Sequence, residues 1–313
     1  MVRDAHLDRA IAQVRRTAAS EAAGPEVRAF FDEPTFTASY VVHDPHTRRA
    51  AIVDSVLDFD AASGRTSTAS AAAIVDYVRA KDLAVELLLE THVHADHMSA
   101  APFLQHELGG RIAIGSVITT VQRTFGEIFN EGPGFARDGS QFDRLFTDGD
   151  DFDLGIPGVA LHVPGHTPAD MAYVIGDAVF FGDTLFMPDY GTARADFPGG
   201  DARQLFHSIR RLMQLPDETR VFLCHDYKAP GRDSYAWETT MLAERVGNVH
   251  VHEGIDEDGF AAMRTARDAT LGMPRLILPS IQINMRGGRL PDPQDNGVRY
   301  LKLPAEQFVR ASL

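Results

Sequence analysis

The stretch ETHVHADHMSAAP, residues 90–102, decides how the rest of this 313-residue sequence is interpreted. It continues the apolar run AVELLL and places His92, His94, Asp96 and His97 close together. Side chains two apart on an extended chain point to the same side, and Asp96 and His97 follow where the chain turns towards the next helix. Imidazole and carboxylate groups are ligands for zinc, iron or manganese. One loop can therefore direct several metal ligands towards one point.

Three other stretches end a strand-like run at a residue of the same kind. LHVPGHTP leads to His166, VFFGDTLF to Asp183 and VFLCHDY to His225. In α/β sheets, ligands collect at the carboxyl ends of strands, and we expect all four stretches to lie there. Left uncompensated, so many titratable groups at a buried strand end would cost several kcal/mol. The pattern therefore indicates a metal site.

The remaining histidines and the one cysteine have simpler interpretations. An isolated histidine is more often a hydrogen-bonded polar residue than a ligand, and we expect this of the following: His6, His43, His46, His106, His207, His250 and His252. Strand alternation points His162 away from the site. Cys224 precedes His225, but a thiol on a buried strand usually acts as a small apolar group rather than as a nucleophile.

Strand-like and helix-like segments alternate along the chain, which predicts an α/β fold with sheets covered by helices. TFTASYVV and RRAAIVDSV flank the turn HDPHT and predict a hairpin. Apolar periodicity predicts helices within 67–83, 201–215 and 256–274. We expect residues 121–152 to form an irregular excursion near the site, and residues 276–293 to form a proline-punctuated tail.

Composition limits the domain organisation and the partners. No compositional break is visible, so we expect an N-terminal extension over 1–27, helical or loose, and one domain with a C-terminal extension over 28–313. The net charge of −14 argues against nucleic acid or an anionic membrane as partner. No apolar run approaches the roughly 20 residues of a membrane span. A single cysteine fits a reducing cytoplasm.

The order His-x-His-x-Asp-His, Gly-His-Thr, Gly-Asp-Thr and a late histidine resembles the metallo-β-lactamase superfamily over 28–228. The resemblance implies an αββα sandwich: two mixed β-sheets flanked by helices, with the metal at one edge. GTARADF, FLCHDY and MPRLILPSIQINMRGG are similar to the persulfide dioxygenases, also called sulfur dioxygenases, over 28–305. The sequence is identified as a member of their bacterial β-lactamase hydrolase-like branch.

Within that family, the resemblance implies one Fe(II) per chain held by His92, His166 and Asp183, with zinc as a substitute. Two histidines and one carboxylate leave positions open for a persulfide sulfur and dioxygen. A surrounding set would orient these ligands and bound water, or hold a second metal: His94, Asp96, His97 and His225. Within and beside that set, the expected catalytic groups are Asp96, His97 and Tyr227.

The implied reaction converts glutathione persulfide, O2 and water to glutathione and sulfite, without an organic cofactor. Arg194 is expected to shape the substrate pocket, or else to form an ion pair with Asp196. Tyr227 is expected to hydrogen-bond the substrate or oxygen, or else to be a packed tyrosine. Human-type members carry Asn-Pro-Arg where this sequence has NVHV, so no glutathione contact is transferred from there to His250. We also consider a homodimer.

Two other functions use the same ligands. A dinuclear thioester hydrolase of the glyoxalase II kind would bind one metal through His92, His94 and His166 and share Asp183 with a second metal. The second metal would be held by Asp96, His97 and His225. That class has a larger helical C-terminal domain, whereas residues 229–313 look short and partly extended. A regulatory metal-binding protein without turnover is disfavoured because no ligand position is substituted.

Overall fold

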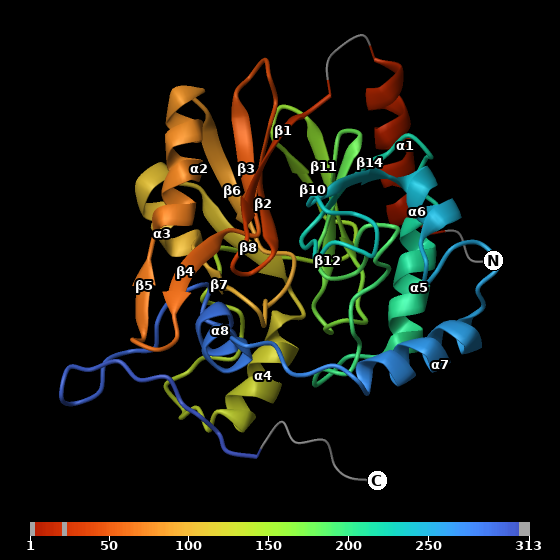
Figure 1. Cartoon of the computed structure of the whole chain (residues 1–313). Coiled ribbons are helices and arrows are strands. Elements are labelled where there is room, and N and C mark those ends of the chain that lie inside the picture. The colour runs from red at the N-terminus through yellow and green to blue at the C-terminus, as the bar shows by residue number, and fades with distance from the viewer. Residues whose placement is uncertain (1–3, 21–23, 307–313) are drawn as a thin grey trace.

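The computed structural model describes residues 4–20 and 24–306, and its two main sheets pack face to face between layers of helices (Figure 1). The first sheet has the order β1-β2-β3-β6-β8-β9, with strands Glu26–Asp32, Thr37–His43, Arg49–Val53, Ala84–Leu89, Arg111–Gly115 and Arg144–Phe146. The second has the order β10-β11-β12-β13-β14-β15, with strands Asp151–Asp153, Pro157–His162, Met171–Ile175, Ala178–Phe181, Arg220–Leu223 and Glu238–Thr240. A small third sheet is formed by β5 (Arg65–Ser67), β4 (Val56–Asp60) and β7 (Met98–Ser99).

Both main sheets are mixed, as expected. In the first sheet, β1, β2 and β3 pair antiparallel, whereas β3, β6, β8 and β9 pair parallel. In the second sheet, only the β13–β14 pair is parallel among the described strands, and it aligns Phe181 with Leu223. Strands β11, β13 and β14 therefore run in one direction, and their carboxyl ends lie at the same edge. Three of the four polar stretches identified in the sequence follow these ends, and the fourth follows the carboxyl end of β6 in the first sheet.

Aromatic side chains fill the space between the sheets. Tyr40 of β2 contacts Phe180 of β13 and Phe222 of β14, with ring centroids 5.5 and 5.4 Å apart, and all three are almost fully buried. Burying each such side chain contributes roughly 1.5–3 kcal/mol. Every residue of β2 is buried, because the strand is covered on both faces. This core holds the two strand-end edges at a fixed separation.

Helices cover the outer face of each sheet (Figure 1). The first sheet is covered by α2 (Ala69–Ala80), α3 (Ala101–Leu108), α4 (Ile118–Ile128) and α8 (Ile277–Asn284). The second is covered by α1 (Ala5–Ala19), α5 (Ala202–Leu212), α6 (Met241–Gly247) and α7 (Glu257–Asp268). Aspartates cap α1, α5 and α7: Asp4 accepts from two backbone N–H groups of α1 at 3.1 Å, Asp201 accepts from Gln204 N at 2.8 Å, and Asp256 accepts from Gly259 N at 2.8 Å. The αββα sandwich expected from the sequence is confirmed.

The hairpin β2–β3 and the helices α2, α5 and α7 confirm the predictions for those segments. Two expectations were wrong. Residues 121–128 belong to α4, because Ile118, Val121 and Phe125 form an apolar stripe that packs against the first sheet. Residues 277–284, expected to be extended, form α8; Pro279 lies in its first turn, where its missing N–H is tolerated.

The segment expected as an N-terminal extension contains α1. Its Leu7, Ala10 and Val14 are buried against the outer face of the second sheet. Gln13 is also buried, and its side-chain amide donates to Val174 O at 3.2 Å. Across the part of the chain that is described, no helix is long and apolar enough to cross a membrane.

The buried carboxyl of Glu244 in α6 makes stability depend on pH. Burial raises the pKa of Glu244 to about 8, and its Oε2 accepts from Asn248 Nδ2 at 2.8 Å. Because the folded-state pKa lies above the ordinary value of 4.5, its contribution is full below that value and is lost as pH rises towards 8. In Glu244→Gln this position stays neutral. We expect the melting temperature of Glu244→Gln, relative to the natural chain, to increase between about pH 5 and 8.5.

Thermal unfolding across that pH range measures the difference. Glu238→Gln, which changes an exposed carboxylate on neighbouring β15, is the matched control and should follow the natural chain. Parallel curves for the natural chain and Glu244→Gln would show that Glu244 is ionised in the fold.

Candidate metal centre

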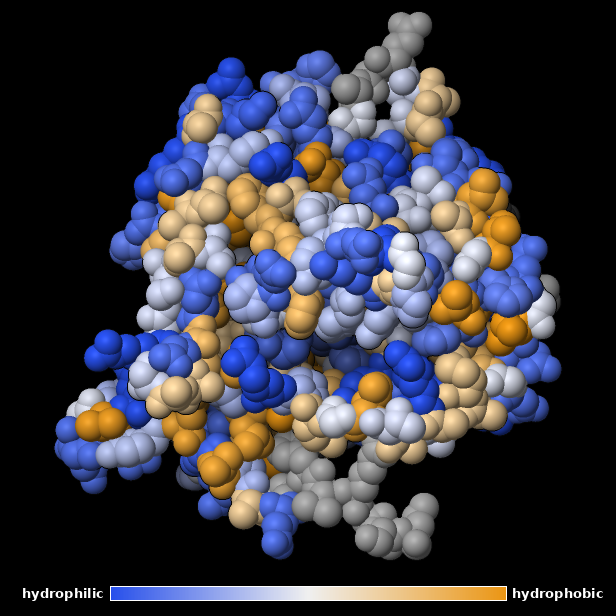
Figure 2. Space-filling model, viewed as in Figure 1, coloured by the Kyte–Doolittle hydropathy of each residue, from blue (hydrophilic) through white to orange (hydrophobic). Residues whose placement is uncertain are grey.

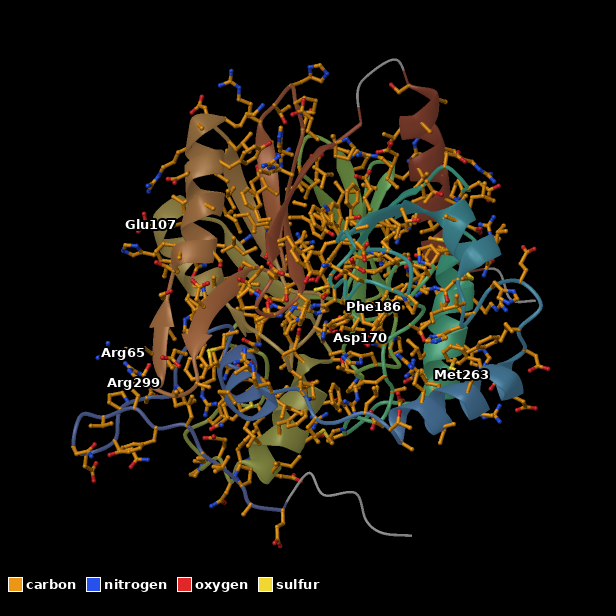
Figure 3. The ribbon with its side chains drawn as sticks, viewed as in Figure 1. Arg65, Glu107, Asp170, Phe186, Met263 and Arg299 are labelled. Carbon is orange, nitrogen blue, oxygen red and sulfur yellow. The ribbon has the colours of Figure 1, made fainter. Side chains whose placement is uncertain are left out.

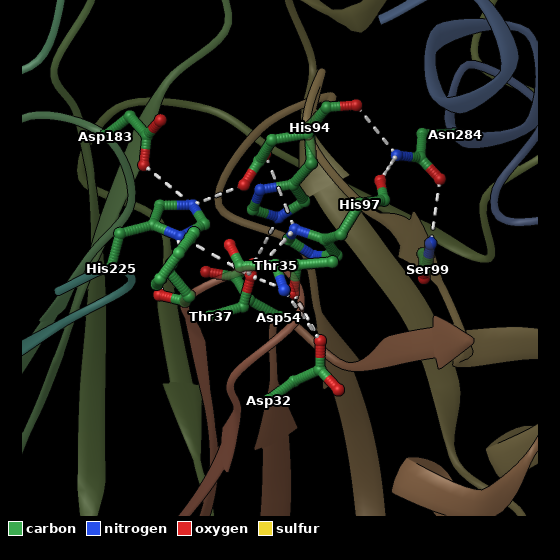
Figure 4. A network of polar contacts seen from close by, with 12 residues as sticks. Asp32, Thr35, Thr37, Asp54, His94, His97, Ser99, Asp183, His225 and Asn284 are labelled. Atoms are coloured by element: carbon green, nitrogen blue, oxygen red, sulfur yellow. Dashed lines mark hydrogen bonds and ion pairs between the residues drawn. The ribbon is translucent and has the colours of Figure 1, made fainter. Parts of the chain in front are cut away.

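Four loops bring the sequence-predicted ligands together at one edge of the sandwich (Figure 4). The loop after β6 carries four of them, and the loops after β11, β13 and β14 supply His166, Asp183 and His225. Gly182 allows the β13 loop to approach, because a Cβ there would lie 2.3 Å from Thr91 Oγ1 and 2.8 Å from His92 Nδ1. The glycine that precedes Asp183 is therefore required by close packing against the first loop.

The chelating side chains fall into two groups. The candidate ligand atoms of His92, His166 and Asp183 lie within 4.8 Å of one another. The same criterion is met by a second group, consisting of His94, Asp96, His97 and His225. The groups adjoin, since His225 Nε2 lies 3.2 Å from Asp96 Oδ2 and 3.3 Å from Asp183 Oδ1. The arrangement can accommodate one cation or an adjacent pair.

Polar atoms at the centre of this cluster are buried and have no hydrogen-bond partner among the described residues. They are His92 Nε2, His94 Nδ1, His97 Nε2, His225 Nε2, Asp96 Oδ2 and Asp183 Oδ1. A buried polar group without a partner costs roughly 1–3 kcal/mol. The ion-pair contacts of His225 Nε2 with Asp96 and Asp183 offset part of this cost, but the other three imidazole nitrogens remain unfavourable unless something binds them. Imidazole nitrogens and carboxylate oxygens match the preferences of zinc and iron. The residues present fit a metal ion.

The nitrogen of each imidazole that faces away from the centre is held by the protein. His166 Nδ1 lies 2.8 Å from Arg194 O, and His94 Nε2 lies 2.9 Å from Asp54 Oδ1. The other three outer nitrogens contact Thr91 Oγ1, Thr37 Oγ1 and Phe36 O, at 3.1 to 3.3 Å. Such outer contacts fix the tautomer and orientation of a metal-binding histidine.

Burial sets the protonation of the cluster. It lowers the pKa of His92 and His94, so both imidazoles are neutral, which is the form that binds metal. For Asp96, burial acts to raise the pKa, but the charges of His225 and His97 outweigh it, and the net shift is downward. Burial raises the pKa of Asp183. At His225 burial acts to lower the pKa, but the charges of Asp96 and Asp183 outweigh it, and the net shift is upward. The centre thus combines neutral imidazoles at His92 and His94 with a His225 that the carboxylates favour in its charged form.

Two carboxylates behind the loop were not identified in the sequence. Burial raises the pKa of Asp54 to about 6 and that of Glu90 well above its ordinary range. Asp54 accepts from Thr91 N and Thr91 Oγ1, both at 2.8 Å, and Glu90 accepts from Ser99 Oγ at 2.6 Å. Asp54 follows β3, and its position at a strand end was the available signal.

Asn284 of α8 holds the metal-binding loop from the other side (Figure 4). Its Nδ2 donates to His94 O at 2.9 Å and to His97 O at 2.8 Å, while its Oδ1 accepts from Ser99 N at 2.9 Å. All these groups are buried. No motif in the sequence signalled this contact, because it joins residues almost 190 positions apart.

A pocket of about 360 Å³ opens above the cluster. Asp96, His166 and Asp183 lie at its floor. Its aromatic wall is formed by Phe186, Tyr190, Phe197 and Tyr227. Figure 3 shows Phe186 in the interior of the molecule and Arg65 and Arg299 at its periphery. The pocket can take a small organic molecule and place one end of it against the cluster.

The two expected substrate-binding residues both line this pocket. Arg194 forms a two-pronged ion pair with Asp196, at 2.6 and 2.9 Å, and its guanidinium lies 4.7 Å from the Phe197 ring centre. The ring of Tyr227 stacks on His225 with centroids 5.8 Å apart. Arg194 thus shapes the wall through its ion pair, and Tyr227 lies beside a candidate ligand.

Two other histidines discussed in the sequence lie outside the cluster, whereas the Sγ of Cys224 lies within 4.8 Å of candidate ligand atoms of Asp183 and His225. His162 Nε2 is 2.8 Å from Pro168 O, and His250 Nδ1 accepts from Thr192 N at 3.0 Å. Cys224 is fully buried, and burial raises the pKa of its thiol. It therefore behaves as an apolar residue.

Comparisons with known proteins agree with this geometry. The family model of the metallo-beta-lactamase superfamily matches residues 32–225, and the chain belongs to that superfamily. It is 56% identical over 291 residues to a probable metallo-hydrolase of Burkholderia pseudomallei, covering 90% of this chain and 99% of that protein. It is 44% identical over 282 residues to glyoxylase B2 of Dictyostelium discoideum, covering 89% and 96%.

Two further similarities concern the ETHE1 proteins. The chain is 30% identical over 207 residues to the mitochondrial persulfide dioxygenase ETHE1 of Homo sapiens, covering 64% of this chain and 68% of that protein. The crystal structure of ETHE1 from Myxococcus xanthus superimposes with a TM-score of 0.66 at 29% identity, covering 84% of this chain and 100% of that one.

Replacing Asn284 by alanine tests the contact between α8 and the loop. Asn284→Ala leaves two buried carbonyls and one N–H without partners, so we expect a loss of about 2–4 kcal/mol in the free energy of unfolding. Metal affinity should fall as well, because the loop is no longer held. Denaturant unfolding and metal analysis measure the two effects, with Asn296→Ala in the exposed tail as control. Unchanged metal content in Asn284→Ala would show that the loop keeps its shape without the contacts of the Asn284 side chain.

Replacing Asp54 by asparagine tests the outer contact of His94. Asp54→Asn removes the carboxylate that holds His94 Nε2, and we expect metal affinity to fall by about 10- to 100-fold. Competition with a chelator measures this affinity. Asp58→Asn is the control, because Asp58 bonds Ser67 and Ser70 at a distance from the loop. Equal affinities for the two variants would assign Asp54 a purely structural role.

Proposed function

We propose that this protein is a persulfide dioxygenase with one Fe(II) per chain. It would oxidise glutathione persulfide with one O2 and one water to glutathione and sulfite, releasing two protons. The oxygen atoms of sulfite then come from O2 and water, and the sulfur–sulfur bond of the persulfide is broken. No organic cofactor takes part.

The grouping of His92, His166 and Asp183 carries this proposal, since the last two of these line the pocket and the three together can hold one metal. Two imidazoles and one carboxylate form a ligand set typical of non-haem Fe(II) oxygenases, which keeps other positions open. Held there, Fe(II) would supply the redox chemistry between the persulfide sulfur and O2. The similarity to the ETHE1 proteins supports the same activity.

Residues around the floor would position the reactants. Asp96 Oδ2, which is buried and without a hydrogen-bond partner, can accept a hydrogen bond from the water that releases sulfite and so orient it. His97 Nε2 faces the same space and can hold that water. Burial raises the pKa of Tyr227, so its hydroxyl stays protonated and can donate to the substrate. The aromatic wall excludes bulk water from the oxidation.

A second candidate function is a dinuclear thioester hydrolase, favoured by two observations. The group formed by His94, Asp96, His97 and His225 could hold another metal. Each of these residues has a buried nitrogen or oxygen atom without a hydrogen-bond partner, which a metal would bind. The relative named glyoxylase B2 also fits a hydrolase. In such an enzyme two metals would activate water for attack on a thioester carbonyl.

Metal analysis combined with oxygen uptake distinguishes the two functions. We expect about one iron per chain and oxygen consumption that depends on glutathione persulfide, with equimolar sulfite produced. The measurement uses anaerobically purified protein, an oxygen electrode and a sulfite assay. Two zinc ions per chain, with cleavage of a glutathione thioester and no oxygen uptake, would establish the hydrolase instead.

Asp183→Ala tests the ligand set itself. Removing one of three ligands should reduce bound iron from about one per chain to a small fraction, and activity should fall by roughly 100-fold or more. Elemental analysis measures the iron. Asp153→Ala, which changes an exposed carboxylate on β10, should keep both iron and activity. Full iron occupancy in Asp183→Ala would show that this carboxylate is not a ligand.

A further inference from the structure

The pocket above the metal centre is positive at its opening although the whole chain is acidic, with a net charge of −14. Apart from the aspartates and the histidine at the floor, its charged lining residues are all arginines: Arg194, Arg264, Arg267 and Arg275. Figure 2 shows hydrophilic and hydrophobic residues side by side over the connection between α7 and α8, which carries Arg275. Arg267 lies in the last turn of α7. A local group of cations on an acidic protein points to an anionic ligand.

Two of the four arginines are already compensated. Arg264 is buried, and its Nε and Nη2 lie 2.8 and 2.7 Å from Asp268 Oδ1. Arg194 pairs with Asp196 and donates to Gly272 O at 2.7 Å. These arginines hold the pocket together, and their charges are matched by aspartates.

Arg267 and Arg275 differ from that pair. Both are exposed, and within residues 4–20 and 24–306 neither has an ion pair or a side-chain hydrogen bond. The charge of Arg267 acts on a neighbouring histidine: burial, followed by the charges of Arg264 and Arg267, lowers the pKa of His250 to about 4. The pocket opening therefore carries two cations that the protein does not neutralise.

The backbone that carries these cations is fixed in place. Asp268 Oδ2 accepts from Ala195 N at 2.9 Å, which ties the end of α7 to the pocket wall. The bond from Arg194 to Gly272 O holds the following segment. Leu271 of that segment lines the pocket. A ligand would meet a positioned surface, which reduces the entropy lost on binding.

We propose that Arg267 and Arg275 form a carboxylate-binding subsite for the glutathione part of the substrate. The identity of the ligand rests on the proposed function. Glutathione carries two carboxylates at some distance from its sulfur, and the planar guanidinium forms paired hydrogen bonds with a carboxylate. The two arginines bind these groups at the opening while the sulfur reaches the floor. Sulfur chemistry at the centre and recognition of the peptide are thus assigned to different ends of one pocket.

Binding of reduced glutathione to iron-loaded protein tests this subsite without any turnover. By calorimetry under nitrogen, Arg267→Gln and Arg275→Gln should each weaken binding about 5-fold, and the double variant about 25-fold. Added salt should reduce the difference in glutathione affinity between the natural chain and these variants, because the arginine–carboxylate contacts are exposed to solvent. Glutathione diethyl ester, which lacks both carboxylates, should bind the natural chain and the double variant equally.

Kinetics provide a second readout. With glutathione persulfide, the double variant should show a KM raised by a similar factor and an unchanged kcat, because the substituted groups do not touch the reacting atoms. Arg16→Gln removes one positive charge on the exposed side of α1, which does not line this pocket, and should change neither quantity. Melting temperatures should match across the set, since the substituted side chains have no partners to lose.

The outcomes separate this inference from the proposed function. Loss of glutathione binding in the double variant, in a protein that takes up no oxygen, would keep the subsite and reject the dioxygenase. Persulfide-dependent oxygen uptake with unchanged KM and glutathione affinity in the double variant would keep the dioxygenase and reject the subsite. The subsite is also rejected if the natural chain does not bind glutathione.

Discussion

Six buried nitrogen and oxygen atoms that the fold gathers but does not hydrogen-bond are the constraint on which the rest of the structure depends. A protein interior tolerates such atoms only if another partner satisfies them. The fold prepares for such a partner by surrounding the cluster with contacts that fix each imidazole in position, such as Asp54 beside His94 and Arg194 O beside His166. The chain thereby accepts an unfavourable arrangement at one edge, supported by a dry aromatic core between the sheets.

The C-terminal segment completes both the centre and the pocket. Through α8, Asn284 holds the loop that carries His94 and His97. Through α7 and the residues after it, the same segment forms the opening of the pocket. The ligands come from the first 225 residues, whereas part of their support and part of the pocket lining come from later residues. A shared metal centre can therefore serve different substrates when this segment changes, which is consistent with many activities within one fold.

Sequence reasoning recovered the parts of the site that depend on local pattern. His92 and His94 alternate on an extended chain, and His166, Asp183 and His225 each follow an apolar strand, so their convergence at a sheet edge could be predicted. The contact of Asn284 could not, because it depends on packing between segments that no local pattern connects. The helix α8 was missed for a related reason: Pro279 suggested an extended tail, although a proline in a first turn is compatible with a helix.

The position of Cys224 has a chemical consequence of its own. It is the chain's single thiol, and it is sealed inside the second sheet with no accessible surface. Thiol–disulfide exchange requires a reachable thiolate, and this sulfur is neither reachable nor readily ionised. A thiol placed this way forms no mixed disulfides with sulfur compounds in solution, whatever reaction the metal centre performs.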